Sequence, residues 1–152
     1  MEIKVELLEG GKMPQKVVKD QAAYDCYSNS FRWDMEAGYF EIGLGFSIEI
    51  PKGYVGKLYP RSSVSNIGIH LANSVGLIDP TYGQEVRARF YPSVIKAVTQ
   101  FEKLDEFIKS VEDDYGVGNR CAQLRIEKDE EYDLVLGDVT SERGGFGSSG
   151  KN

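Results

Sequence analysis

The polar side chains best suited to phosphate chemistry fall in three short clusters. Asp79 follows an apolar run, and a carboxylate at such a turn can accept a hydrogen bond from water and deprotonate it. Arg61 precedes Ser62 and Ser63, so a guanidinium whose fork of donors matches phosphate oxygens lies beside two hydroxyls. Gln123 adds an amide at the start of another apolar segment. Each cluster alone also suits an ordinary turn or strand end, so the interpretation depends on their combination.

Glycine and serine dominate the end of the chain, from Glu142 to Gly150, around one arginine and one phenylalanine. This composition cannot form a core and is typical of a flexible terminus. It also suits closure over a ligand, because glycine N–H groups can approach phosphate oxygens closely. Ordering about ten residues costs about 1–2 kcal/mol each. We therefore expect this arm to close only over a ligand that offers both a base and several phosphates.

The elements that must position these residues follow from the hydrophobic pattern. Apolar and polar residues alternate in short runs separated by glycine and proline, which is typical of β-strands. The expected strands are 3–7, 39–42, 46–50, 54–59, 86–91, 121–127 and 132–136, and Asp79 is expected on a hairpin over 73–82. This pattern predicts an all-β fold, a sandwich or jelly roll, in one domain over residues 1–140, followed by the Gly/Ser-rich arm over 141–152.

One segment departs from the strand pattern. Between Val94 and Val111 the apolar residues recur at spacings of three and four, which predicts one amphipathic helix around 94–114 inserted between two strands. The apolar face of this helix either packs on the sheet or serves as a docking surface for a protein regulator. In the second case, Phe101, Phe107 and Ile108 are the expected anchors.

Charge and composition exclude several classes of protein. The net charge of -6 and the pI of about 4.9 come without a basic stripe, which argues against nucleic-acid binding. No apolar run is long enough to span a membrane, and the N-terminus does not have the pattern of a signal peptide. Cys26 and Cys121 lack metal-site spacing, so free buried thiols are expected. We therefore expect a cytoplasmic protein, in a bacterium or in the host cell of a virus.

Taken in order, these clusters resemble the five motifs of the trimeric dUTPase family. The matching segments are Ala22–Ser28, Pro60–Ser63 with Gly68, Asn73–Tyr82, Arg120–Gln123 and the Gly/Ser tail with Phe146. The chain departs from the family at Ala23, where a glycine is usual, and in the order of Gly83 and Gln84. The tail is also shorter, so that Arg143 matches the family arginine only across a gap.

The resemblance implies a dUTPase-like jelly roll and magnesium-dependent hydrolysis of dUTP to dUMP and pyrophosphate, which limits uracil incorporation into DNA. It also implies a homotrimer with active sites shared between subunits. Asp79 is then expected to orient and deprotonate the attacking water, and Tyr82 to stack under the deoxyribose and exclude a 2′-hydroxyl. Asn73 and backbone groups near Gly76 and Ile78 are the expected uracil contacts.

The remaining implied roles concern the triphosphate. Arg61, Ser62 and Ser63 are expected to contact phosphate oxygens, and Gln123 to hold phosphate-bound water. Asp25 is expected to reach Mg²⁺ through a water molecule, since magnesium keeps several waters and takes direct ligands from the substrate. The tail is expected to cover the uracil and clamp the γ-phosphate through Phe146, Arg143, Ser148 and Ser149.

Two other functions remain open from the sequence. The first is that of the dCTP deaminases, which share the fold and several of these motifs. They need a glutamate on the strand after the Asp79 turn, where this chain has Arg89. A nucleotide-gated interaction module, with a regulator at the inserted helix, is the second alternative and is compatible with catalysis.

Overall fold

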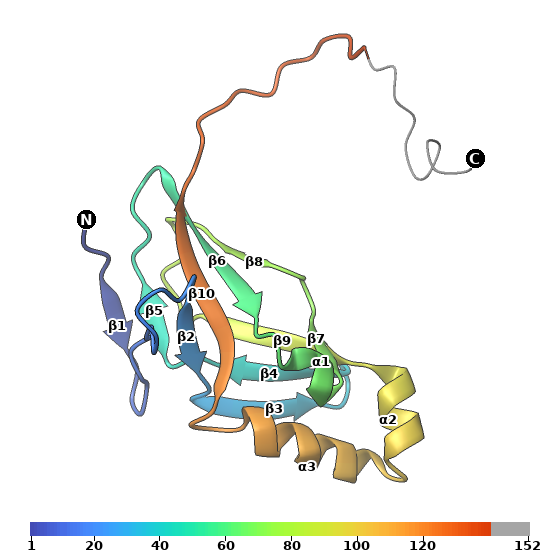
Figure 1. Cartoon of the computed structure of the whole chain (residues 1–152). Coiled ribbons are helices and arrows are strands. Elements are labelled where there is room, and N and C mark those ends of the chain that lie inside the picture. Colours follow the sequence, from blue (N-terminus) through green and yellow to red (C-terminus); the bar gives the residue numbers. More distant parts are fainter. Residues whose placement is uncertain (141–152) are drawn as a thin grey trace.

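The computed structural model describes residues 1–140 and confirms a mainly β fold (Figure 1). The strands are β1 Val5–Leu7, β2 Tyr24–Tyr27, β3 Ser30–Asp34, β4 Tyr39–Gly43, β5 Phe46–Ile48, β6 Tyr54–Pro60, β7 Ile69–Leu71, β8 Gly76–Ile78, β9 Arg87–Pro92 and β10 Arg120–Lys128. The helices are α1 Val64–Ile67, α2 Val94–Gln100 and α3 Leu104–Tyr115.

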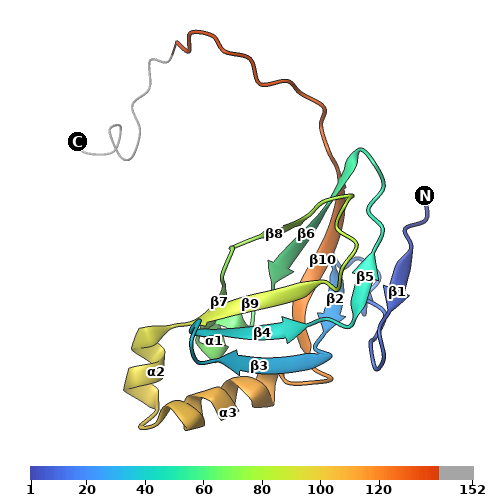
Figure 2. The same ribbon diagram turned by 180° about the vertical axis from the view of Figure 1, so that it is seen from behind.

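Two four-stranded sheets enclose the core. Their strand orders are β2-β10-β6-β8 and β3-β4-β9-β7, β1 pairs separately with β5, and every pairing is antiparallel. The strands of the two larger sheets run in clearly different directions (Figures 1 and 2). One hydrophobic cluster draws on both sheets, so the architecture is a β-sandwich of the jelly-roll type that the alternating pattern predicts.

Period-two alternation determines which side chains enter this core. On β4, Phe40 and Ile42 are fully buried and Glu41 points to the opposite face of the sheet. On β9, Phe90 lies in the core, while Arg89 is paired with Glu41 on the outer face. The inner face is therefore apolar and the outer face carries charge.

The segment between β9 and β10 forms two helices rather than the single predicted helix. The chain is extended at Phe101 and Lys103, between α2 and α3. The ring centroids of Phe101 and Phe107 lie 5.5 Å apart. Six residues along a continuous helix would turn the second ring about 240° from the first. The bend therefore brings both rings to the same site.

The second of these helices is part of the core. Phe107, Val111 and Tyr115 are at most 1% exposed, and Phe107 meets Phe40 edge to face at 6.0 Å. The proposed docking anchors are therefore corrected: Phe107 is buried, and Phe101 and Ile108 pack against the core. By contrast, α2 has no buried residue.

Residues 129–140 leave the sandwich as an extended arm (Figure 1). The predicted strand at 132–136 is wrong for the single chain, although its apolar alternation is present. A strand needs a hydrogen-bonding neighbour, and no part of residues 1–128 pairs with this segment. As a result Tyr132, Leu134 and Leu136 are exposed by 75%, 92% and 106%.

Both cysteines are free and fully buried, as predicted. Burial raises the pKa of the Cys26 thiol and raises that of Cys121 to about 12. They lie on the adjacent strands β2 and β10, each directly after a charged residue of the candidate site. Among residues 1–140, no helix is both long and apolar enough to cross a bilayer.

Candidate active site

Polar side chains from three separate segments converge where β6 ends and β10 begins. Asp25 on β2 is the strand-pair partner of Gln123 on β10, and Gln123 Nε2 donates to Asp25 Oδ1 over 3.2 Å. Arg120 Nη1 donates to Asp25 Oδ2 over 3.2 Å, and Arg61 Nε lies 3.8 Å from Asp25 Oδ1. We call Asp25, Arg61, Arg120 and Gln123 the Asp25 cluster.

The Asp25 carboxylate is 2% exposed, yet it remains ionised. Burial acts to raise the pKa of Asp25, but the side chains of Gln21, Gln123 and Arg120 outweigh it, so that the pKa lies below its ordinary value. The carboxylate thereby fixes two guanidinium groups. Within residues 1–140, the Nη2 atoms of Arg61 and Arg120 make no hydrogen bond, so each arginine retains a donor for an anionic ligand.

The loop after β6 presents hydroxyls beside these arginines. Arg61 Nη1 donates to the Arg120 carbonyl over 3.3 Å and makes a long contact of 3.5 Å with Ser63 Oγ. Ser62 is exposed and Ser63 half-buried. The short helix α1 follows and ends at Gly68, whose φ of 85° is in the left-handed region that favours glycine. This sharp stop fixes the loop between β6 and β7.

The segment that carries the predicted uracil contacts crosses between the two sheets. The predicted hairpin is wrong, because β7 pairs with β9 and β8 pairs with β6, so β7 and β8 do not pair with each other. The exposed turn between them contains Asn73 and Ser74, and Ser74 has a φ of 60°. Each strand is only three residues long, and each forms the edge of a different sheet.

Asn73, Gly76 and Ile78 lie close together on this crossover. A methyl group added to Gly76 would lie 3.3 Å from Asn73 Nδ2 and 3.3 Å from Leu58 Cβ, tighter than an ordinary contact. Gly76 and Ile78 are buried, whereas Asn73 is exposed. A residue without a side chain at position 76 therefore leaves room for the Asn73 amide beside the backbone of β8.

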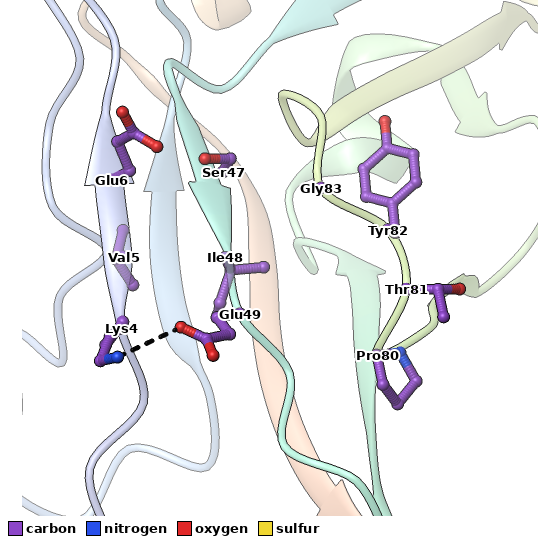
Figure 3. A pocket seen from close by; sticks show the side chains of 10 residues that line it. All are labelled: Lys4, Val5, Glu6, Ser47, Ile48, Glu49, Pro80, Thr81, Tyr82 and Gly83. Carbon is purple, nitrogen blue, oxygen red and sulfur yellow. Dashed lines mark ion pairs between the residues drawn. The ribbon is translucent and has the colours of Figure 1, made fainter.

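Asp79 and Tyr82 follow β8 on one exposed turn, which is closed by the Tyr82 N–H donating to the Asp79 carbonyl over 3.0 Å. The Tyr82 hydroxyl donates to the Glu85 carbonyl over 2.8 Å, which fixes the ring orientation. Figure 3 shows Tyr82 on one wall of a surface pocket, opposite β1 and β5. Tyr82 and Asn73 also line a second, polar pocket with Tyr39 and Arg89. The ring is thus accessible from two sides.

One protomer separates the predicted site residues into two groups. Among residues 1–140, no hydrogen bond or ion pair joins Asp79, Asn73 or Tyr82 to the Asp25 cluster. For Asp79 the register explains why: Ile78 pairs with Gly56, so Asp79 lies one position beyond the start of this pairing, whereas Arg61 follows the other end of β6. Six residues of strand separate the two positions by about 20 Å.

Arg120 is a residue of this site to which the sequence alone assigns no role. Its place at the start of the Arg120–Gln123 segment is the available signal, because a charged residue at the first position of a largely buried strand lies at the end of that strand. His70, which no motif uses, is exposed and its ring lies 5.9 Å from that of Tyr91.

A separate charge cluster occupies the outer face of the β3-β4-β9-β7 sheet. Glu41, 8% exposed, accepts from Arg89 Nε over 2.9 Å, Arg87 Nη1 over 3.0 Å and Arg32 Nη2 over 3.2 Å. Burial acts to raise the pKa of Glu41, but hydrogen bonds from Arg89 and Arg32 lower it overall. The Arg89 guanidinium also lies 4.8 Å from the centre of the Tyr39 ring.

The remaining predicted contacts, Arg143, Phe146, Ser148 and Ser149, lie outside the described residues.

Comparison with known proteins finds relatives over most of the chain. A deoxyuridine 5′-triphosphate nucleotidohydrolase of Mycolicibacterium gilvum is 30% identical over 151 residues, covering 91% of this chain and 87% of the relative. The chain belongs to the dUTPase family. A prophage-derived dUTPase of Bacillus subtilis is 33% identical over 113 residues, covering 72% of this chain and 70% of that protein. No family model matches the sequence.

Solved dUTPase structures share the fold. The dUTPase of Staphylococcus bacteriophage 80alpha, solved with dUPNHPP, has a TM-score of 0.70 at 26% identity, and the match covers 98% of both chains. A point mutant of the dUTPase from phage phi11 of S. aureus also gives a TM-score of 0.70, at 23% identity, and covers 93% of this chain and 100% of that one. The latter structure concerns the coordination of a structural Mg(II) ion.

Proposed function

We propose that this dUTPase cleaves dUTP to dUMP and pyrophosphate by attack of water on the α-phosphorus, which keeps uracil out of DNA. The Asp25 cluster is the observation that carries the proposal. A buried, ionised carboxylate holds Arg61 and Arg120 with free donors beside the hydroxyls of Ser62 and Ser63, a donor set suited to a triphosphate. We assign the reaction to the cytoplasm, where free thiols such as those of this chain stay reduced.

Asp79 orients and deprotonates the attacking water in this scheme. Its exposed position on a closed turn leaves the carboxylate available to a water molecule. Tyr82, with its ring orientation fixed by the bond to the Glu85 carbonyl, stacks under the deoxyribose and leaves no room for a 2′-hydroxyl. Asn73 and the backbone at Gly76 and Ile78 read the uracil edge.

The two groups of site residues meet between protomers of a homotrimer. We call residues 61–63, the loop after β6, the phosphate loop. A separation of about 20 Å along β6 is too large for Asp79 and the phosphate loop of the same chain to act on one phosphorus atom. One copy therefore supplies the Asp25 cluster and another supplies Asp79. The arm 129–140 supports this assembly, because a second copy would cover its exposed apolar side chains.

The C-terminal tail completes the proposed site. In this scheme residues 141–152 close over the bound nucleotide, with Phe146 on the uracil and Arg143, Ser148 and Ser149 on the γ-phosphate. The direction of the preceding arm, away from its own sandwich, favours closure over the site of a neighbouring copy (Figure 1).

The donor set fits magnesium that arrives with the substrate. No group of three or more His, Cys, Asp or Glu side chains within residues 1–140 could hold a metal ion. The Asp25 carboxylate, already shared with two arginines and an amide, suits contact through water rather than direct coordination. When bound, Mg²⁺ would neutralise phosphate charge and orient the triphosphate. Gln123 would hold a phosphate-bound water in the same place.

Pyrophosphate release from dUTP, dTTP, dCTP and UTP tests the reaction. We expect release from dUTP alone, and near-complete loss in Asp79→Asn, which keeps the shape of the side chain but removes the base. Asp105→Asn, an exposed change at the start of α3, is the matched control and should keep full activity. Unchanged turnover in Asp79→Asn would exclude the proposed mechanism.

Mixing two inactive variants tests the shared site. Asp79→Asn and Arg61→Gln damage different halves, so a site formed by two copies is intact when each copy supplies its undamaged half. Random assembly of equal amounts should restore about a quarter of wild-type activity, half times half. A site contained in one protomer would give no recovery.

The two rival functions have separate tests. Deamination of dCTP is disfavoured because Arg89, at the position that needs a proton-carrying acid, is bound to Glu41. Ammonia release from dCTP would reverse this choice.

A regulator-binding role is favoured by α2, whose Val94, Ile95 and Val98 are exposed by 68–77%. The phage 80alpha relative is one of the dUTPases that control transfer of virulence genes. We propose α2, rather than α3, as the surface for a protein regulator. Replacing these three apolar residues with serine should leave hydrolysis unchanged and reduce regulator binding.

A further inference from the structure

The inserted helix α3 carries a buried hydroxyl that its packing does not explain. Tyr115, the last residue of α3, is 1% exposed, and its ring meets Phe90 edge to face at 5.6 Å. Its hydroxyl oxygen is buried without a hydrogen-bond partner among residues 1–140. Phenylalanine would fill the same space without this unfavourable burial of a polar atom. The hydroxyl therefore calls for another explanation.

The neighbours of this hydroxyl belong to the phosphate loop. Burial raises the pKa of Tyr115, and the Ser63 side chain and the charge of Arg61 act against that rise. The Ser63 side chain acts on the pKa of Tyr115, and α3 packs against α1, the helix that follows Ser63 directly. The Tyr115 hydroxyl nevertheless makes no hydrogen bond of ordinary geometry within residues 1–140. The Ser63 hydroxyl is itself available to donate a hydrogen bond, because it does not cap α1 and receives only a 3.5 Å contact from Arg61.

Both inserted helices support this loop. Lys96 of α2 donates to the Asn66 carbonyl of α1, and α3 packs against α1 and β10. After α3 the chain leads through Asn119 directly to Arg120. The Asn119 carbonyl accepts a hydrogen bond from the Ser28 N–H over 2.8 Å. The insertion is thus connected to the phosphate loop at one end and to the Asp25 cluster at the other.

We propose that Tyr115 is a positioning residue for the phosphate loop: its hydroxyl donates to Ser63 Oγ when Ser63 donates to a phosphate oxygen of the bound nucleotide. A chain of two hydrogen bonds polarises the second donor, so Ser63 binds phosphate more strongly with Tyr115 behind it than alone. The Tyr115 hydroxyl has no partner among residues 1–140, and this hydrogen bond would satisfy it. This inference rests on the proposed function, since it assigns the nucleotide phosphates to the loop.

A double-mutant cycle with Tyr115→Phe and Ser63→Ala tests the proposal, with kcat and KM for dUTP measured for all four proteins. We expect Tyr115→Phe to lower kcat/KM by about three- to tenfold, the effect of one neutral hydrogen bond. Its midpoint of unfolding should be unchanged or raised. In the Ser63→Ala background the same change should have no further effect. Tyr54→Phe, distant from the loop, is the matched control and should equal the wild type.

Binding of inorganic tripolyphosphate, measured by calorimetry, separates this inference from the proposed function because it needs no turnover. Tyr115→Phe should weaken tripolyphosphate binding by a similar factor, again only while Ser63 is present. Failure of the wild type to release pyrophosphate from dUTP would contradict the proposed function. Equal tripolyphosphate binding by wild type and Tyr115→Phe, or effects of the two changes that multiply independently, would overturn the role of Tyr115.

Discussion

Replacing Phe107 with alanine should destabilise the protein strongly, although this residue lies in an insertion. Phe107 is 1% exposed, and its ring lies 6.0 Å from that of Phe40 in β4 and 5.5 Å from that of Phe101. Truncating a buried phenylalanine costs about 3–5 kcal/mol, including the loss of transfer free energy and the cavity left behind. Native domains are stable by about 5–15 kcal/mol, so the variant should lose a large share of its stability.

Urea unfolding at one fixed protein concentration measures this effect, because assembly makes stability depend on concentration. Val98→Ala in α2 is the matched control: Val98 is 71% exposed, and its truncation should change the free energy of unfolding by less than about 0.5 kcal/mol. A Phe107→Ala loss below about 1 kcal/mol would refute the assignment of α3 to the core. An equal loss at Val98 would show that a second copy covers α2.

Three further predictions concern charge and shape. Asp25→Asn should lower kcat for dUTP by about 10–100-fold, because two arginines lose the carboxylate that holds them, and steady-state kinetics will show whether it does. The pKa of Glu41 is lower in the folded protein than its ordinary value of 4.5. The Glu41 carboxylate therefore stabilises the fold at pH values above 4.5, and this stabilisation is lost as the pH falls through the lower pKa of the folded state. Glu41→Gln should therefore flatten the acid side of a plot of urea midpoint against pH, and an unchanged slope would contradict this. Gly76→Ala should raise KM for dUTP about tenfold by displacing the Asn73 amide; an unchanged KM would place that amide outside the site.

The strands were predictable where alternation reports burial on one face. Phe40 and Ile42 flank Glu41, and this pattern alone fixes which side chains of β4 face the core. The pattern cannot report pairing partners. Segment 132–136 alternates equally well, but residues 1–128 of the same chain offer it no hydrogen-bonding neighbour. A single sequence does not distinguish these two cases.

The inserted helices were predictable in type but not in shape. Spacings of three and four from Val94 to Val111 fit one continuous helix, and nothing local breaks it. The bend at Phe101 comes from tertiary packing, which brings that ring against Phe107. The sequence left open whether the apolar face packs on the sheet or serves for docking, and it did not separate the exposed residues of α2 from the buried residues of α3.

Most of the phosphate half of the candidate site could be assembled from motifs, because Asp25, Arg61 and Gln123 come from segments whose order was recognisable. The role of Arg120 depends on geometry, since only the strand register directs it to the Asp25 carboxylate. The separation of Asp79 from this cluster could not be predicted from the sequence either. It follows from the pairing of β8 with the early part of β6.

Alkylation of the two buried thiols can measure how often β2 and β10 separate. Cys26 follows Asp25 and Cys121 follows Arg120, and neither sulfur is accessible to an alkylating reagent in the closed protein. Modification therefore waits for β2 and β10 to separate, so the rate of alkylation counts the openings of the strand pair that carries the charge cluster. Slower alkylation with nucleotide present would show that ligand binding stabilises the pairing of β2 with β10. This measurement needs no label on the enzyme.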